Sequence, residues 1–305
     1  MTSTSRNQRR APARAGAALC ILVTLAGCGR TAVTATATNS DAALRTTAAS
    51  RPGPEPLKRL NGAHINITEG QTVGVGMPIS VTFSRPVPQD RRADTERQLR
   101  VVAGVEGSWS WVKDRNLLDG QRVDFRPHTY WKPGTKVTVH AGSGITRHFT
   151  VGRSLIATVD VRTHTMKVVK DGSTRTVPIT AGAPGMDTWN GTMIVMDKAR
   201  KVFMDSRTVG YGDAYADYYH YAVHLTASGT YLHQNPKADT YAGHQNVTHG
   251  CVGLATDGTA ERFYEEVIPG DVLTVVGSKE TVAPGNGYGD WNVDWADWRA
   301  GSALR

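Results

Sequence analysis

The feature that most constrains the fold is a succession of short segments in which apolar and polar side chains alternate. Ile79-Ser80-Val81-Thr82-Phe83-Ser84 is the clearest example, because its apolar residues fall on every second position. A period of two places neighbouring side chains on opposite faces of a strand, so one face can be buried while the other stays polar. Turn signals such as Asp119-Gly120 and Pro133-Gly134 separate these segments. The pattern predicts a mainly β chain.

The first group of segments predicts an immunoglobulin-like β-sandwich at residues 60–152. Several short strands at this spacing, separated by turns, are typical of that architecture. The region has no cysteine pair, so packing alone must stabilise its core. The expected strands are Ile79–Ser84, Leu99–Val102, Trp109–Val112, Arg122–Phe125, Lys136–His140 and His148–Val151.

Four aromatic residues of this region, Trp109, Trp111, Tyr130 and Trp131, admit two interpretations. They could form a surface on which a carbohydrate stacks. Packing in the core and at the edges of the sandwich is the favoured interpretation, because aromatic side chains bury a large apolar area.

A second β-rich domain is expected at residues 153–277. Asp171-Gly172 predicts a tight hairpin turn. One main helix is expected at residues 261–267, with Thr256 or Asp257 as its cap. The expected strands are Leu155–Val161, Thr165–Lys170, Ser173–Ile179, Thr192–Met196, Lys201–Met204, Tyr221–Leu225, Thr230–His233 and Val272–Val276.

The N-terminal residues predict export. Four arginines precede the apolar run Ala15–Ala26, which is shorter than the roughly 20 residues that span a bilayer core. The run ends in Leu25-Ala26-Gly27-Cys28, which resembles the cleavage box of bacterial lipoproteins. By that resemblance residues 1–27 are a signal peptide and Cys28 is lipidated; a plain secretory signal is the alternative. The protein would then be anchored to the outer face of the cell membrane, facing the cell wall.

Composition restricts the partners and cofactors. Residues 28–59 are rich in Thr, Ala, Ser and Pro and are expected to be a disordered tether. Loss of residues 1–27 removes four arginines and no acid, which lowers the formal net charge from +8 to +4. No basic run with interleaved aromatics remains, so no nucleic-acid partner is expected. No phosphate-binding glycine loop is present either, and no nucleotide or other cofactor is expected.

Cys251 is the one cysteine expected to remain a free thiol in the mature chain. It follows Gly250, and His249 and His233 precede it at short distances along the chain. Such a cysteine can be an activated nucleophile, because an imidazole generates the attacking thiolate and an imidazolium stabilises it as an ion pair. A buried, unreactive thiol is the alternative.

A zinc site is a further alternative, because histidines crowd this stretch. His220 and His224 have the separation of a helical metal pair. No glutamate lies between them as a zincin requires, and the local pattern indicates a strand. No metal is therefore expected.

These motifs resemble the L,D-transpeptidase family, which has a YkuD-like catalytic domain. The similarity covers about residues 154–277. It rests on the strand that ends at His233, the element His249-Gly250-Cys251-Val252, the helix with Phe263-Tyr264 and the segment Pro269-Gly270-Asp271-Val272. The preceding sandwich and lipoprotein tether resemble actinobacterial members of the family.

The resemblance implies roles for individual residues. Cys251 is the expected nucleophile and His233 its general base, while His249 either orients the base or shapes the turn. Main-chain N–H groups of the turn are expected to face the oxyanion. The expected oxyanion and substrate-binding residues are Tyr215 in a flap over the pocket, Gly250, Gln234, Met204 and Thr248.

The sequence departs from the family pattern at four positions. Thr248 stands in place of serine and keeps a hydroxyl. Gly253 stands where arginine or asparagine is usual, so a polar side chain expected to hold the turn or contact substrate is absent. Gln234 and Lys237 replace a small residue and an aromatic residue. These departures bear on substrate orientation and rate.

The resemblance also implies a reaction. Cys251 would attack the carbonyl of the third residue of a peptidoglycan tetrapeptide stem and expel the terminal D-alanine. A side-chain amine of a second stem would then resolve the thioester and form a 3→3 crosslink. Carbapenems would acylate the same thiol. An L,D-carboxypeptidase that uses water as acceptor and a noncatalytic wall-binding lipoprotein are the alternatives.

The C-terminal tail, residues 278–305, contains an aromatic stripe. Trp291, Trp295 and Trp298 are spaced as one face of a helix, for which Asp290 is the expected cap. The tail is expected to pack on the catalytic domain. A helix on the membrane surface is the alternative, which the charges of Asp294 and Asp297 oppose.

Overall fold

The computed structural model of the protein describes residues 56–304. The predicted signal peptide, the lipidation site at Cys28 and nearly all of the predicted tether lie outside the described residues. Residues 54–305 form one compact unit. Within its described part, no helix has the length and apolar character that a membrane crossing requires.

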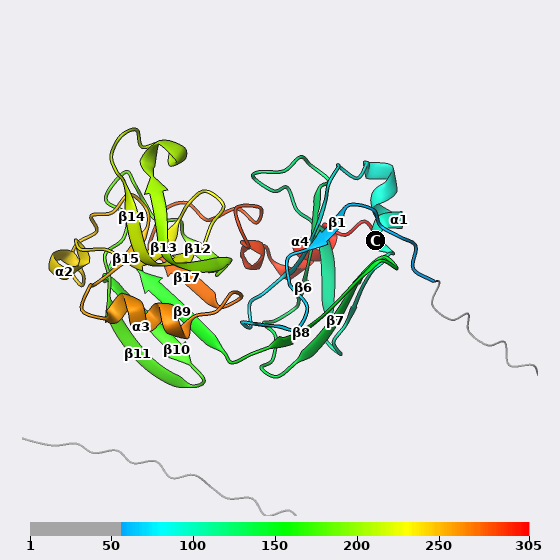
Figure 1. Cartoon of the computed structure of the whole chain (residues 1–305), viewed down its shortest axis with the longest axis horizontal. Helices are drawn as coiled ribbons and strands as arrows, with labels where there is room; N and C mark the ends of the chain where they lie inside the picture. Colours follow the sequence, from blue (N-terminus) through cyan, green and yellow to red (C-terminus); the bar gives the residue numbers. More distant parts are fainter. Residues whose placement is uncertain (1–55, 305) are drawn as a thin grey trace, which may run out of the picture. The chain divides into compact units, whose positions relative to one another are not determined.

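Two four-stranded sheets form the N-terminal sandwich, which confirms the predicted architecture (Figure 1). One sheet has the order β1-β3-β6-β5, with β1 Ala63–Ile65, β3 Ile79–Phe83, β6 Arg122–Pro127 and β5 Gly107–Trp111. The other has the order β2-β8-β7-β4, with β2 Gln71–Val73, β8 Ile145–Val151, β7 Lys136–Ala141 and β4 Leu99–Val102. The 3-10 helix η1, Gln89–Arg91, and helix α1, Arg92–Glu96, connect β3 to β4.

The aromatic residues of the sandwich pack in its core and at its edges, where Trp111 and Tyr130 are half-buried. Trp109 and Trp131 are 8% and 2% exposed, and the Trp109 ring contacts Phe125 edge-on with centroids 5.4 Å apart. Trp111 stacks on Phe83. The structure therefore supports core and edge packing over a surface for carbohydrate stacking.

Two further sheets form the second domain. The five-stranded sheet has the order β11-β10-β9-β17-β12, with β11 Ser173–Pro178, β10 Thr165–Lys170, β9 Leu155–Asp160, β17 Val272–Val276 and β12 Gly191–Ile194. The four-stranded sheet has the order β13-β14-β15-β16, with β13 Asp197–Asp205, β14 Ala216–His224, β15 Tyr231–Gln234 and β16 Val252–Leu254. One hydrophobic core contains Met166, Leu232 and Phe263 together with residues of both sheets.

The local turn and helix signals of this domain are visible in the structure. Lys170 pairs with Ser173 across a two-residue turn, in which Asp171 and Gly172 have φ of 47° and 84°. Positive φ at both central residues defines the tight hairpin turn that this dipeptide favours. Helix α3 spans Thr259–Glu266, so it begins two residues before the predicted helix, and it buries Phe263 and Tyr264. The predicted cap at Thr256 or Asp257 is wrong, because Gly258 is the N-cap and makes no side-chain hydrogen bond to the helix.

The hairpin of β13 and β14 is longer than predicted. Only Lys201–Met204 and Tyr221–Leu225 were expected as strands, whereas the structure pairs nine-residue strands from Asp197↔His224 to Asp205↔Ala216. Most of the added residues are exposed or half-buried on both faces. They therefore lack the apolar alternation that identifies a half-buried strand. The 3-10 helix η2, Ser206–Val209, lies at the tip.

The tail contains a shorter helix than predicted. Trp291 belongs to the 3-10 helix η3, Asp290–Asn292, and only Trp295 and Trp298 lie in helix α4, Trp295–Ala300. The predicted cap at Asp290 is wrong. Asp294 caps α4, because its carboxylate accepts the backbone N–H of Asp297 at 2.8 Å.

Helix α4 packs on the immunoglobulin-like sandwich, and this corrects the expected docking on the second domain. The indole N–H of Trp298 donates to the carbonyl oxygen of Ser108 at 2.9 Å, and Trp298 is 1% exposed. The Arg126 guanidinium of β6 lies 4.8 to 5.3 Å from the ring centroids of all three tail tryptophans. The sequence predicts the aromatic face of the tail but does not identify Arg126 as the cation that packs against its three rings.

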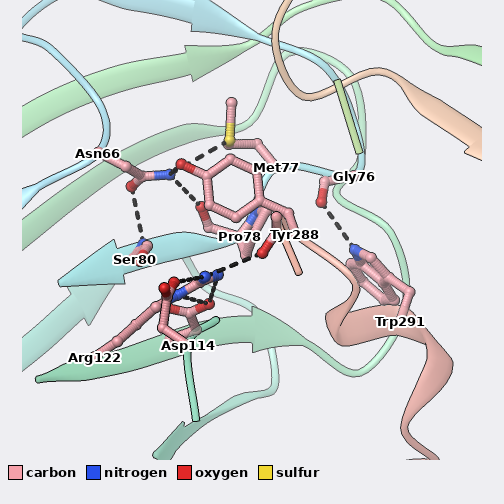
Figure 2. Close-up of polar contacts among 11 residues, drawn as sticks. Asn66, Gly76, Met77, Pro78, Ser80, Asp114, Arg122, Tyr288 and Trp291 are labelled. Carbon is pink, nitrogen blue, oxygen red and sulfur yellow. Dashed lines mark hydrogen bonds and ion pairs between the residues drawn. The ribbon is translucent and has the colours of Figure 1, made fainter. Parts of the chain in front are cut away.

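The tail residues before α4 contact both domains. Asn292 donates from Nδ2 to the carbonyl oxygen of Thr192 in β12 at 2.8 Å. On the sandwich side, Asn66 donates to the Tyr288 hydroxyl at 3.0 Å and the Trp291 indole donates to the carbonyl oxygen of Gly76 at 2.8 Å (Figure 2). The tail therefore bridges the two domains.

Candidate active site

Parallel pairing of two short strands brings Cys251 and His233 together. In the register of β15 and β16, Leu232 pairs with Val252 and His233 with Gly253. Cys251 directly precedes Val252, so strand alternation places it on the same face as His233. A parallel pair requires a long crossover connection, and this one carries helix α2, Ala238–Tyr241, and the turn that precedes Cys251.

The two side chains line one cavity of about 200 Å³. Both are largely buried, with exposed fractions of 9% for Cys251 and 3% for His233. The other residues that line this cavity are Met204, Ala214, Tyr215, Tyr219, Asn235, Lys237, Thr248 and His249. The structure thus brings together the predicted nucleophile, the predicted base and four further predicted site residues.

A backbone carbonyl orients the base. His233 Nδ1 lies 2.6 Å from the carbonyl oxygen of Gln234. Because a carbonyl oxygen only accepts hydrogen bonds, Nδ1 carries the proton and Nε2 of the neutral ring is an acceptor. The Cys251 thiol lies 3.9 Å from the carbonyl oxygen of Gly229, to which it donates weakly. Gln234, and not His249, therefore orients His233.

Burial controls the protonation of the pair. It lowers the pKa of His233 from 6.5 to about 4, and it raises the pKa of Cys251 from 9.0 to about 11. Low-dielectric surroundings disfavour the charged form of each group. Near pH 7 the resting pair is a neutral thiol beside a neutral imidazole, and not the ion pair that the sequence suggested.

Thr248 holds the turn that presents the thiol. Its hydroxyl donates to the carbonyl oxygen of Cys251 at 2.6 Å and accepts the N–H of Gly250 at 3.3 Å. Gly250 has φ of 108°, a conformation that favours glycine. In this structure the Gly250 N–H is engaged inside the turn, so it is not the free oxyanion donor that we expected.

His249 belongs to an aromatic cluster with the flap. Its ring lies 5.7 Å from that of Tyr211 and 5.4 Å from that of Tyr215. Burial and the nearby Cys251 raise the pKa of Tyr215 to about 12, so its phenol stays protonated and can donate. Tyr215 directly precedes strand β14 and contacts the ring of His249, while its role in a flap over the substrate stays a prediction.

Tyr219 and Asn235 line the cavity, although neither was selected from the sequence. Tyr219 packs edge-on against His233 with ring centroids 4.7 Å apart. It is one of several tyrosines in β14, and no sequence signal distinguishes it. The sequence predicts Gln234 as a site residue instead of Asn235, but Gln234 lines neither this cavity nor the second one of about 880 Å³. It lies one strand position from His233 and so faces the opposite side of the sheet.

A second cavity of about 880 Å³ adjoins the first at Tyr215 and His249, which line both. Its walls include Arg115 of the sandwich and Lys279 of the tail. Residues from both domains therefore line this larger cavity.

The histidines considered for zinc do not share a helix. His220 and His224 lie on strand β14, and His224 contacts Asp197 and the carbonyl oxygen of Thr226. Among residues 56–304, no group of three or more His, Cys, Asp or Glu side chains is arranged to hold a metal ion.

The fold and the site define a class of protein in which an immunoglobulin-like domain precedes a β-rich domain with a Cys–His cavity. Residues 28–143 match the family model of a bacterial Ig domain, and residues 154–276 match that of the L,D-transpeptidase catalytic domain. L,D-transpeptidase 1 of Mycobacterium tuberculosis is 38% identical over 230 residues, which cover 73% of this chain and 88% of that protein. The chain belongs to the L,D-transpeptidase family.

Other relatives agree with this membership. L,D-transpeptidase 5 of Mycobacterium tuberculosis is 33% identical over 269 residues, which cover 82% of this chain but only 58% of that protein. A solved structure of an L,D-transpeptidase in complex with imipenem has a TM-score of 0.63 at 34% identity and covers 72% of this chain and 100% of that one. L,D-transpeptidase 3 of Mycobacterium tuberculosis, solved with a faropenem-derived adduct, has a TM-score of 0.60 at 30% identity. The match covers 70% of this chain and 96% of that one.

Proposed function

We propose that this protein is a peptidoglycan L,D-transpeptidase that forms 3→3 crosslinks by acyl transfer through Cys251. The donor is a tetrapeptide stem, and the acceptor is the side-chain amine of a second stem. The observation that carries the proposal is the shared cavity of Cys251 and His233, in which the Nδ1–H bond to Gln234 leaves Nε2 as a proton acceptor. Membership of the family supports the choice of substrate.

The reaction follows from these protonation states. As the sulfur attacks the carbonyl carbon of the third stem residue, Nε2 of His233 takes the thiol proton. The tetrahedral intermediate collapses, the bond to D-alanine breaks, and the imidazolium returns the proton to the departing amine. The acceptor amine then attacks the thioester and gives a proton to His233, which restores the thiol as the crosslink leaves.

Tyr215 is the side chain best placed to stabilise the oxyanion. Its protonated phenol lines the cavity that contains the thiol, and burial holds its pKa near 12. A donor in a site with little water stabilises developing charge more strongly than it would in water. Lys237 also lines the cavity and adds positive charge beside an anionic peptide.

Product analysis tests this proposal directly. The full chain is incubated with a disaccharide-tetrapeptide, and the products are followed by mass spectrometry. A crosslinked dimer with released D-alanine indicates transpeptidation, whereas tripeptide without dimer indicates an L,D-carboxypeptidase. If neither forms, and if binding to sacculi survives Cys251→Ala, the noncatalytic wall-binding alternative replaces the proposal.

We further propose that carbapenems acylate Cys251. The family includes structures with imipenem and with a faropenem-derived adduct. Intact-mass spectrometry should show one imipenem adduct on the wild type and none on Cys251→Ala. Wild type that stays unmodified would contradict this proposal.

For localisation we propose export and lipid anchoring through Cys28, on the basis of the Leu25-Ala26-Gly27-Cys28 box. The wild type should then fractionate with membranes and incorporate a labelled fatty acid. The variant Cys28→Ser should lose the label. Equal labelling of the two proteins would refute the anchor.

A further inference from the structure

Asn235 projects from the end of strand β15 into the cavity that contains Cys251 and His233. Its backbone is fixed, because its N–H donates to the carbonyl oxygen of Leu254 at 2.9 Å. Its side-chain oxygen is fixed as well, because Oδ1 accepts the backbone N–H of Lys237 at 3.0 Å. Asn235 is therefore a rigid element of the cavity wall, although it lies just outside the strand.

The glycine at position 253 makes room for this side chain. A Cβ atom on Gly253 would lie 3.0 Å from Cβ of Asn235, 3.4 Å from its Nδ2 and 2.9 Å from Cγ2 of Thr180. The contact with Thr180 would require that side chain to move, and the contact with Cβ of Asn235 would require Asn235 to shift by a few tenths of an ångström. Asn235 thus occupies the space into which a side chain at 253 would project. The glycine at position 253 and the asparagine at position 235 therefore depend on each other, because a larger residue at 253 would need the space that Asn235 fills.

The amide nitrogen of Asn235 is an uncommitted donor. The bond from Lys237 identifies the acceptor atom as oxygen, which fixes the orientation of the amide. Nδ2 then carries two N–H groups, and within residues 56–304 the structure gives them no protein acceptor. An asparagine donor beside a nucleophile suits a ligand with an acceptor at that place, and Lys237 on the same wall favours one with negative charge.

We propose that Nδ2 of Asn235 donates a hydrogen bond to a peptide carbonyl of the acyl-donor stem and so positions the stem for attack by Cys251. This inference rests on the proposed transpeptidase function and adds a residue to it. Asn235 then supplies, from the neighbouring strand, the polar contact that is absent at Gly253.

Two substitutions of Asn235 test the donor. Asn235→Asp keeps the oxygen that accepts from Lys237 and removes both N–H groups. Asn235→Ser adds no charge and carries a shorter hydroxyl, whose single O–H lies one bond nearer the backbone than Nδ2. With the tetrapeptide donor, each should lower kcat/KM about tenfold, mainly through a higher KM, because a binding contact is lost while the thiol and its base are intact. Asp257→Ala is the matched control, since Asp257 Oδ1 accepts the N–H of Thr259 in an equivalent turn but is exposed and outside both cavities.

A transplant tests the relation between the two positions. Gly253→Asn alone should lower kcat/KM, because its Cβ crowds Thr180 and displaces Asn235. The triple variant Thr180→Ser, Asn235→Gly, Gly253→Asn removes both crowded atoms and returns an amide to the cavity. It should have a higher kcat/KM than the single variant Asn235→Gly, which lacks the amide and serves as the reference.

Three outcomes decide the inference. Lower kcat/KM in both Asn235 variants, an unaffected control and recovery in the triple variant support it. If the wild type crosslinks stems while the Asn235 variants, folded as judged by circular dichroism, match its kcat/KM, the role of Asn235 is refuted and the proposed function stands. If the wild type releases no D-alanine, the proposed function and this inference both fail.

Discussion

At the scale of single residues, burial determines how the candidate nucleophile and base work. Neither Cys251 nor His233 is charged near neutral pH, because the low-dielectric cavity disfavours both ions. In the proposed reaction, proton transfer to His233 must therefore accompany attack of the sulfur on the substrate. The Gln234 carbonyl engages Nδ1 of His233, so Nε2 is the ring nitrogen left to accept this proton.

The pH dependence of acylation should reflect these shifts. The neutral pair exists between the two pKa values, about 4 for His233 and about 11 for Cys251. The second-order rate of Cys251 acylation by imipenem should therefore stay level from pH 8 to about 5 and fall only as His233 gains a proton near pH 4. Stopped-flow rates, corrected for hydrolysis of imipenem without enzyme, measure this profile. An acid midpoint near 6.5 would show an unshifted histidine.

The hydroxyl of Thr248 should matter more than its methyl group. Thr248→Val leaves the buried carbonyl of Cys251 and the N–H of Gly250 without their partner, at a cost of about 1–3 kcal/mol in the free energy of unfolding. Thr248→Ser keeps both bonds and should cost less than about 1 kcal/mol. Urea unfolding monitored by fluorescence compares the two variants. Equal losses would mean that the methyl group, and not the hydroxyl, stabilises the turn.

At the scale of secondary-structure elements, the sequence predicts strands well where one face is buried. Strands β10 and β17 have the predicted bounds, because their apolar residues face the core. The hairpin of β13 and β14 extends beyond its prediction, since its outer residues are solvated on both faces. Whether Gln234 or Asn235 lines the cavity depends on which face of β15 meets it. A shift of one position in the strand register exchanges the two faces, and the sequence does not fix that register.

The sequence does not predict where α4 docks, because the spacing of its tryptophans identifies the face that is buried but not the surface that covers it. In the structure that surface belongs to the immunoglobulin-like sandwich, and a substitution in α4 tests this packing. Trp298→Ala should lower the free energy of unfolding by about 3–5 kcal/mol, since it removes a buried ring and its bond to Ser108. Trp295→Ala, at a half-buried position of the same helix, is the control and should cost less. Calorimetry of the full chain measures both, and similar small losses would contradict the docking.

At the scale of the whole molecule, the tail places a buried acid at the junction of the domains. Asp290 is fully buried, and neither of its oxygens accepts a hydrogen bond from residues 56–304. Asp124 and the guanidinium groups of Arg122 and Arg126 face it, as does Tyr288. Burial, followed by repulsion from Asp124, raises the pKa of Asp290 well above its usual value despite the arginines.

This shift predicts how pH affects stability. A carboxyl group whose pKa is higher in the folded than in the unfolded protein binds its proton more tightly when folded. Its contribution to stability therefore decreases as pH rises from the unfolded value of 3.8 through the raised folded value, and above that it is a constant penalty. Asp290→Asn removes the penalty and should raise the free energy of unfolding at pH 7 by more than about 1 kcal/mol, since one pKa unit corresponds to about 1.4 kcal/mol. Below pH 3.8 the variant and the wild type should converge.

Asp294→Asn is the matched control for this change. It removes the same charge from an exposed position, and asparagine caps helices as well as aspartate does, so its effect should be small at every pH. Thermal unfolding of the three proteins between pH 3 and 8 separates the buried from the exposed carboxyl group. If Asp290→Asn instead destabilises the protein at pH 7, Asp290 is ionised and paired with Arg126, and the domain junction is held by a buried ion pair. The expected gain in stability would instead mean that packing and the remaining pair of Arg122 with Asp124 suffice to hold the tail between the two domains.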